Sequence, residues 1–239
     1  MHPTVKTARV AGFLYLAAGP AAPFALIYLP GKLIVRGDAA STANNIAAHE
    51  MLFRLGIVAE LYTAVLLALL VVVLYRLLSD VNKTHARLMV GLVLVSVAIT
   101  FVNVVNNIAA LTLFRGADYA YLSVFDKPQR DAMGMLFLGL HSQGLFVNEI
   151  FWGLWLVPFG LLVMKSGFIP RILGVLLIVN GFALVAVSLT WLLFPAYGNV
   201  AFRASMPALL GEIWIMLWLL IKGAKVEALP AAASSSASA

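Results

Sequence analysis

Long apolar runs separated by short polar stretches are the dominant pattern along this chain of 239 residues. A helix needs about 20 predominantly apolar residues, with a range of roughly 17 to 25, to cross the hydrocarbon core of a bilayer. Six runs reach that length: residues 10–29, 53–75, 88–113, 134–164, 171–194 and 205–221. The pattern predicts an all-α fold, a bundle of six transmembrane helices that form one domain over residues 1–225. Residues 226–239 are rich in Ala and Ser and predict a disordered cytoplasmic tail.

Composition agrees with this prediction, because 63% of the residues are hydrophobic, 11% are charged and the mean hydropathy is +1.00. Soluble domains carry about 25% charged residues. The net charge of +6 does not indicate nucleic-acid binding, because the basic residues stand singly at the ends of apolar runs. No nucleic-acid partner is expected. The absence of cysteine excludes disulfides, thiolate metal sites and cysteine nucleophiles.

An even number of spans places both termini on the same side of the membrane. Nine Lys and Arg residues fall on that side and seven on the other. Basic residues are enriched on the cytoplasmic side. We therefore predict a multi-pass protein of the bacterial cytoplasmic (inner) membrane with both termini in the cytoplasm.

The first apolar run has features of both a secretory signal and a membrane span. A basic start, an apolar stretch and Ala-rich residues are typical of a signal peptide. The run continues through Leu29, however, which favours a span. Pro20 and Pro23 predict a kink, because each removes a backbone donor and clashes with the preceding turn.

The connection over residues 30–52 is long and predicts a helix on the outer side that leads into the second span. Ser41 is the candidate N-cap, since a serine side chain can accept a hydrogen bond from a free backbone N–H.

The spans also contain signs of a threefold internal repeat. The odd-numbered spans each begin with an Arg followed by a Gly about one turn later: Arg9 and Gly12, Arg87 and Gly91, Arg171 and Gly174. The even-numbered spans carry acids, and Glu149 to Trp155 aligns without gaps to Glu212 to Trp218, with Glu60 as a weaker third copy. The pattern suggests three pseudo-repeated hairpins. Shared membrane composition without shared descent is the alternative.

Polar residues inside the spans predict a layer at one depth. Glu60, Glu149 and Asn103 each lie 16 positions from a basic residue at the inner end of their span, or about 24 Å at 1.5 Å per residue. Asn106 and Asn107 share the helix face of Asn103. Glu212 and Asn180 form a second level, about 15 Å from the inner end.

His141 lies 24 positions from Lys165, farther than the core is thick, so we place it at the mouth of a cavity. We expect the fourth span to break or project outward over residues 139–144. Arg54 lies near the outer entrance of the second helix.

Together these residues predict an outward-facing polar cavity that binds a small polar ligand, a cation or protons. An intramembrane carboxylate is costly and is by default a functional candidate, and two carboxylates in contact can share one proton. The alternative is interhelical glue, because Asn side chains join membrane helices through hydrogen bonds. A single His is more often packed than a ligand, and the five Trp residues are most simply lipid or helix contacts rather than a cofactor site.

Several segments resemble a known family. These are residues 37–38 with 41–46, 52–56, 151–153, 165–174 and 218–223, and the most specific is the turn Lys165-Ser166-Gly167-Phe168-Ile169-Pro170-Arg171. The chain resembles, over nearly its whole length up to Lys225, a bacterial integral-membrane family catalogued as domain of unknown function 4386. The resemblance implies a multi-pass membrane protein and no particular activity, catalytic residue or cofactor.

Three functional classes follow. The first is a transporter or receptor-like protein, and a break at Pro158, near Gly153 and Gly160, would suit a transporter. The second is a membrane enzyme in which carboxylates and His141 form a metal or acid–base site, although no metal-binding spacing occurs. The third is a structural or assembly subunit of a membrane complex. The expected partners are the lipid bilayer and the small ligand.

Overall fold

The computed structural model describes residues 3–224, and every regular element in that part of the chain is a helix. Six helical stretches are long and apolar enough to cross a membrane: Val5–Leu33, Glu50–Leu78, Lys83–Phe114, Lys127–Lys165, Arg171–Leu193 and Pro195–Ile221. The prediction of an all-α bundle with six spans is confirmed. The tail predicted over residues 226–239 lies outside the described residues.

The first span is interrupted where the prolines predict it. It comprises α1 (Pro3–Ala18), α2 (Ala21–Pro23), the π-helical turn η1 (Phe24–Tyr28) and α3 (Leu29–Leu33). Pro20 and Pro23 have no N–H to donate, so the hydrogen-bond ladder cannot continue unchanged past Gly19. The predicted kink is confirmed, and a π-helical turn follows it.

A short helix, α4 (Ala39–Ala48), precedes the second span as predicted, but it begins earlier than predicted. Its N-cap is Asp38, whose Oδ1 accepts a hydrogen bond from the backbone N–H of Ser41 at 2.9 Å and whose Oδ2 accepts one from the Ser41 hydroxyl at 2.6 Å. The prediction of Ser41 as N-cap is therefore wrong, because an aspartate three residues earlier already caps the helix. The two bonds from Ser41 lower the pKa of Asp38.

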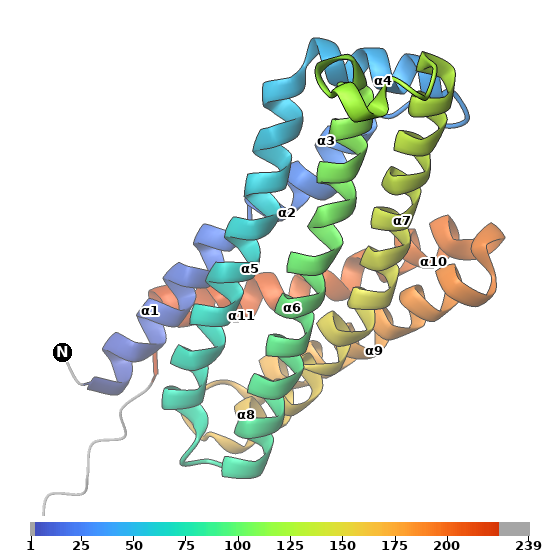
Figure 1. Ribbon diagram of the computed structural model, residues 1–239. Coiled ribbons are helices and arrows are strands. Elements are labelled where there is room, and N and C mark those ends of the chain that lie inside the picture. Colours follow the sequence, from blue (N-terminus) through green and yellow to red (C-terminus); the bar gives the residue numbers. More distant parts are fainter. Residues whose placement is uncertain (1–2, 225–239) are drawn as a thin grey trace, which may run out of the picture.

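Three long helices stand side by side and form the main body of the molecule (Figure 1). They are α5 (Glu50–Leu78), α6 (Lys83–Phe114) and α7 (Lys127–Leu154). At 1.5 Å per residue these helices are about 43, 48 and 42 Å long, which exceeds the roughly 30 Å of a hydrocarbon core. The short turns η2 (Gly116–Asp118) and η3 (Ala120–Leu122) connect α6 to α7. Asp126 and Gln129 form a capping box that starts α7.

The fourth span changes direction at Trp155, between α7 and α8 (Leu156–Lys165). Pro158 lies one turn farther along and cannot donate to the carbonyl of Leu154. The break suggested at Pro158 is thus present. The break expected over residues 139–144 is not, because α7 continues through them.

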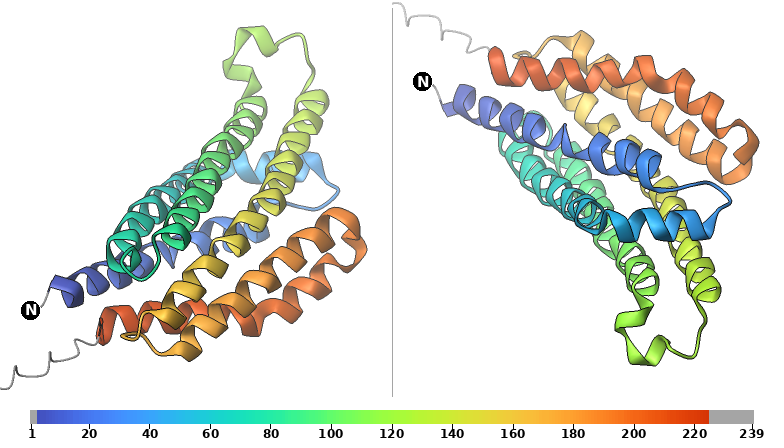
Figure 2. Two further views of the ribbon diagram at one scale, coloured as in Figure 1. Left: turned by 90° about the horizontal axis from the view of Figure 1, so that it is seen from below. Right: turned by 90° about the horizontal axis from the view of Figure 1, so that it is seen from above.

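The last two spans form a hairpin that crosses the long helices at an angle (Figure 1). It consists of α9 (Arg171–Leu193), the turn η4 (Pro195–Tyr197), α10 (Gly198–Ser205), η5 (Met206–Leu209) and α11 (Leu210–Ile221). The views in Figure 2 agree that α11 runs beside α1, and the Arg9 guanidinium donates to the carbonyl of Ile221 at 3.3 Å. The first and last described helices therefore have ends on one side of the molecule, which we call the terminal end. The opposite side is the α4 end.

Glycines allow the second and third hairpins to pack closely. A Cβ added at Gly153 would overlap the carbonyl of Gly181, and one added at Gly160 would approach the carbonyl of Gly174. Gly153 and Gly160 are seven residues apart in the fourth span, as Gly174 and Gly181 are on α9, and these contacts bring the backbones of α7 and α8 against α9. Of the three glycines in the suggested repeat, Gly12 and Gly174 make such contacts, whereas Gly91 faces open space.

Candidate functional site

Four buried polar side chains meet between α5, α6 and α7, and we call them the Glu60 cluster: Glu60, Asn103, Asn107 and His141. Each is less than 10% exposed. The His141 Nε2 lies 2.9 Å from Oε2 of Glu60, and the Asn107 side-chain amide donates to Oε1 of Glu60 at 3.2 Å. Both oxygens of the carboxylate thus have partners, and three helices meet at one acid.

The remaining amide of the cluster fixes the backbone of α7. Asn103 donates from its side chain to the carbonyl of His141 at 2.9 Å, and Asn106 donates to the side-chain oxygen of Asn103 at 3.2 Å. Close approach depends on Gly144, because a Cβ there would overlap the Asn103 amide. The sequence therefore places a glycine where the side chain of Asn103 on α6 needs the space.

This geometry can hold a proton or a positive charge. The imidazole bonded to Glu60 is neutral in one protonation state and cationic in the other, and the carboxylate can accept from it in both. Because Glu60 and His141 are buried away from water, any electrostatic attraction between them is stronger than it would be in water. The Asn107 amide keeps one oxygen of Glu60 bonded while the other faces the histidine.

Glu149 lies elsewhere on α7, closer to the terminal end. It follows His141 by eight residues, or about 12 Å along the helix. Its neighbour Asn148 donates to the Thr100 hydroxyl at 2.9 Å, which places this level of α7 beside the middle of α6. Glu149 is 8% exposed, and its side chain hydrogen-bonds to none of the residues between 3 and 224. It is an acid in an apolar bundle without a bonded partner in that part of the chain.

A second polar group occupies the other half of the bundle, and we call it the Glu212 cluster. The Tyr15 hydroxyl donates to Oε2 of Glu212, and the Asn180 side-chain amide donates to Oε1 at 2.6 Å. The three residues belong to α1, α11 and α9. Asn180 is fully buried, and the ring of Tyr15 lies 6.4 Å from that of Trp155.

The structure rearranges the layer that the sequence predicts. It brings Glu60, Asn103 and Asn107 together as predicted, and Asn180 with Glu212 as predicted. His141 belongs to the Glu60 cluster and not to a mouth beyond it, and Glu149 is not level with Glu60. The cause is the turn at Trp155, because a count of residues from Lys165 assumes one straight helix.

Arg54 and Asn106 take peripheral positions. The Arg54 guanidinium donates to Glu50 at 2.6 Å, and Glu50 also accepts from Arg115 at 2.9 Å. This exposed ion-pair network holds the start of α5 to the end of α6. Asn106 is half-buried and contacts the cluster only through Asn103.

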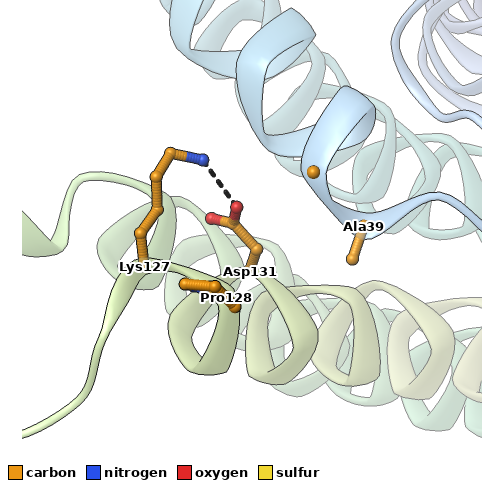
Figure 3. Close-up of a pocket in the computed structure, with 5 residues that line it drawn as sticks. Ala39, Lys127, Pro128 and Asp131 are labelled. Atoms are coloured by element: carbon orange, nitrogen blue, oxygen red, sulfur yellow. Dashed lines mark hydrogen bonds and ion pairs between the residues drawn. The ribbon is translucent and has the colours of Figure 1, made fainter.

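Sequence reasoning missed Tyr15, Thr100 and the polar role of Asn148. A hydroxyl or amide in the middle of an apolar run is the signal that marks each of them. It also missed Asp131, an acid near the start of α7 that is 4% exposed and pairs with Lys127 at 2.6 Å. Figure 3 shows this pair beside a hollow of about 270 Å³ at the α4 end, lined also by Ala39, Ala40 and Pro128.

Across residues 3–224, no three His, Asp or Glu side chains are grouped as a metal site would require. Glu60, Glu149 and Glu212 instead lie on three different helices, α5, α7 and α11.

The helices and the buried polar groups define a multi-pass helical membrane protein. Residues 10–223 match the model of the family described as Domain of unknown function (DUF4386), and the chain belongs to that family. An uncharacterized protein of the archaeon Archaeoglobus fulgidus is 31% identical over 156 residues, which is 65% of this chain and 76% of the relative. No solved structure matches the chain.

Proposed function

We propose that this protein is a transporter or receptor-like membrane protein that binds protons, or a small polar or cationic ligand, at the Glu60 cluster. The observation that carries the proposal is the contact of two ionisable side chains, Glu60 and His141, inside a membrane bundle where such groups are expensive to keep. Interhelical glue alone needs no ionisable pair, because Asn103 and Asn107 already provide amides.

Access from one side follows from the position of the cluster. Glu60 is ten residues from the start of α5, and Asn107 is seven residues from the end of α6, so both lie within about 15 Å of the α4 end of their helices. The helices α5 and α6 are longer than the hydrocarbon core of a bilayer is thick. The cluster is therefore nearer to water at the α4 end than at the terminal end.

We also propose that the α4 end faces outward and that both termini are in the cytoplasm of a bacterial cell. The support is the excess of Lys and Arg at the terminal end, nine against seven. A phosphatase fused to the C-terminus and active only outside the inner membrane would overturn this orientation, whereas fluorescence of a fused cytoplasmic reporter would support it.

The binding proposal is tested with the proton as the probe. Proteoliposomes on a solid-supported membrane are exposed to a jump from about pH 8 to about pH 5.5, which spans the usual titration range of histidine. We expect a transient charge displacement in the wild type that is lost in Glu60→Gln and in His141→Asn. Glu50→Gln and His49→Asn are the matched controls, because these residues lie outside the cluster and should keep the transient.

Persistence of the full transient in both cluster variants would refute proton binding at this pair. If neither wild type nor controls give a transient, native mass spectrometry of gently purified protein tests for a retained small molecule instead. A molecule bound to the wild type and absent from folded Glu60→Gln would support the ligand form of the proposal. If nothing is bound to either protein, the cluster serves only to join the helices through hydrogen bonds, and the proposal is overturned.

A further inference from the structure

The Glu212 cluster contains an acid with no positively charged partner among the described residues. Glu212 accepts two hydrogen bonds, both from neutral groups, the Tyr15 hydroxyl and the Asn180 amide. It forms no ion pair with any Lys, Arg or His between residues 3 and 224. An ionised carboxylate inside a membrane protein is normally paired with a cation or placed in a water-filled space.

The same cluster has unused oxygen acceptors. A carboxylate offers about four lone-pair positions, and two of those on Glu212 are used. The side-chain oxygen of Asn180 is buried and has no hydrogen-bond partner, although the residue is fully enclosed. An unpartnered buried oxygen costs about 1 to 3 kcal/mol unless another group satisfies it. The Tyr15 hydroxyl donates a hydrogen bond to Glu212, and its oxygen keeps acceptor capacity.

The cluster thus contains four oxygens from three helices, two from the Glu212 carboxylate and one each from Asn180 and Tyr15. Hard metal cations prefer carboxylate, amide and hydroxyl oxygens. One carboxylate balances one positive charge, and no further Asp, Glu or His joins it in the described residues. A divalent ion would leave an uncompensated positive charge in the bundle, so the charge count favours a monovalent one.

The protein does not enclose the whole cluster. Asn180 is fully enclosed, but Glu212 and Tyr15 are only half-buried. The acid therefore lies at the flank of the molecule, near the line along which α1 and α11 run side by side (Figure 2). Gly12 lets α1 approach the α11 backbone at Leu220. Gly211 lets α11 approach α9 at Leu176. These contacts hold the three contributing helices in place around the acid.

We propose that Glu212, Asn180 and Tyr15 form a binding site for a small monovalent metal cation, separate from the Glu60 cluster. The site goes beyond the proposed function, because it lies on other helices and no hydrogen bond among the described residues joins the two clusters. In this site Glu212 supplies the charge, the Asn180 oxygen supplies a neutral ligand, and Tyr15 orients the carboxylate.

Equilibrium binding of radioactive sodium or rubidium tracer to the purified full-length protein tests the site, with choline chloride keeping the ionic strength constant. We expect saturable binding of one of the two tracers, at about one ion per chain, given a single carboxylate. Glu212→Gln should abolish it. Tyr15→Phe keeps the ring beside Trp155 and should weaken binding several-fold, whereas Tyr62→Phe, an exposed tyrosine on α5, should leave it unchanged.

If Glu212→Gln does not fold, the nearly isosteric Asn180→Leu and Tyr15→Phe carry the test. Failure of both tracers to bind folded wild type would overturn the proposal, as would full binding by folded Glu212→Gln. Glu60→Gln separates the two sites, since it should lose the proton response and keep the tracer. If Glu60→Gln loses tracer binding and Glu212→Gln keeps it, the ion binds at the Glu60 cluster. That result would also overturn the proposal.

Discussion

His141 Nε2 lies 2.9 Å from Glu60 Oε2, although the two residues are 81 positions apart in the chain. The contact joins α7 to α5 and is enclosed on both sides, since neither residue is more than 8% exposed. A buried polar group that loses its partner cannot turn to water. The stability of the bundle and its capacity to bind a proton should therefore depend on the same pair.

A double-mutant cycle of Glu60→Ala and His141→Ala should reveal this coupling. Each single variant leaves a buried polar group unpaired and should destabilise the protein by about 1 to 3 kcal/mol. The double variant removes both groups and should cost less than the sum of the two, by about 0.5 to 3 kcal/mol. Unfolding in mixed micelles measures all three values. Strict additivity would show that the pair contributes no interaction energy.

The effect of a substitution at Glu149 on folding should depend strongly on the charge of the new side chain. The Glu149 side chain forms no hydrogen bond or ion pair with the described residues, so Glu149→Gln removes no such interaction and should fold with the melting temperature of the wild type or a higher one. Glu149→Lys places a long cation in the bundle and should reduce membrane insertion or folding, at about 2.5 to 3.5 kcal/mol for a Lys at the centre of a span. Yield of monodisperse protein and thermal melting report the outcome. Normal melting of Glu149→Lys would show that this position faces water or lipid headgroups.

The close packing of α8 on α9 should be intolerant of a single methyl group. In Gly160→Ala the added Cβ meets the Gly174 carbonyl and the Ile178 side chain, so we expect a loss of about 1 to 3 kcal/mol from overpacking. Gly91→Ala is the matched control, because its Cβ meets nothing within 4 Å. It should be neutral or slightly stabilising, as Ala favours helix over Gly. Equal effects of the two variants on the melting temperature would contradict the packing.

The span boundaries could be predicted because hydropathy and helix length depend on local sequence alone. The kink at Pro20 and Pro23 was equally local, since it follows from a missing N–H. The N-cap of α4 shows the limit of this reasoning. Asp38 and Ser41 are both good caps, and the choice between them depends on the backbone of residues 35–38, where Val35 already bonds to the Thr42 side chain.

The site was predicted in part for a related reason. Glu60, Asn103 and Asn107 could be grouped from residue counts, because α5 and α6 are continuous. The depth of His141 could not, because the turn at Trp155 changes the direction of the fourth span. Tyr15 was overlooked because one tyrosine in an apolar run is common, and only the fold brings it to an acid 197 positions away.

The cap of α4 predicts a pH dependence. The folded-state pKa of Asp38 is lowered below its usual value of 3.8 by hydrogen bonds from Ser41. A lowered pKa means that the stabilisation is fully present above the unfolded value and is lost as the pH falls through the folded one. Amide hydrogen exchange of residues 39–48 should therefore be slow near neutral pH and increase below pH 3.8, relative to the intrinsic rate.

Asp38→Asn retains an N-cap acceptor but not the charge, and it should remove that acid step while keeping most of the protection at neutral pH. Asp38→Ala should lose the protection at all pH values. An acid step that persists in Asp38→Asn would assign the titration to another group.

Infrared difference spectroscopy of the protein in native-like membranes tests proton binding at the Glu60 cluster, because it observes the carboxyl groups themselves. The spectra are recorded while the pH is stepped across the titration range of histidine, about 5 to 8, for wild type, Glu60→Gln, His141→Asn and the control Glu50→Gln. The account predicts a titrating carboxyl or imidazole band that is present in wild type and the control, absent in Glu60→Gln and shifted in His141→Asn. A wild-type spectrum that is unchanged by both cluster substitutions would show that the Glu60 cluster neither gains nor loses a proton, and would contradict its role as the binding site.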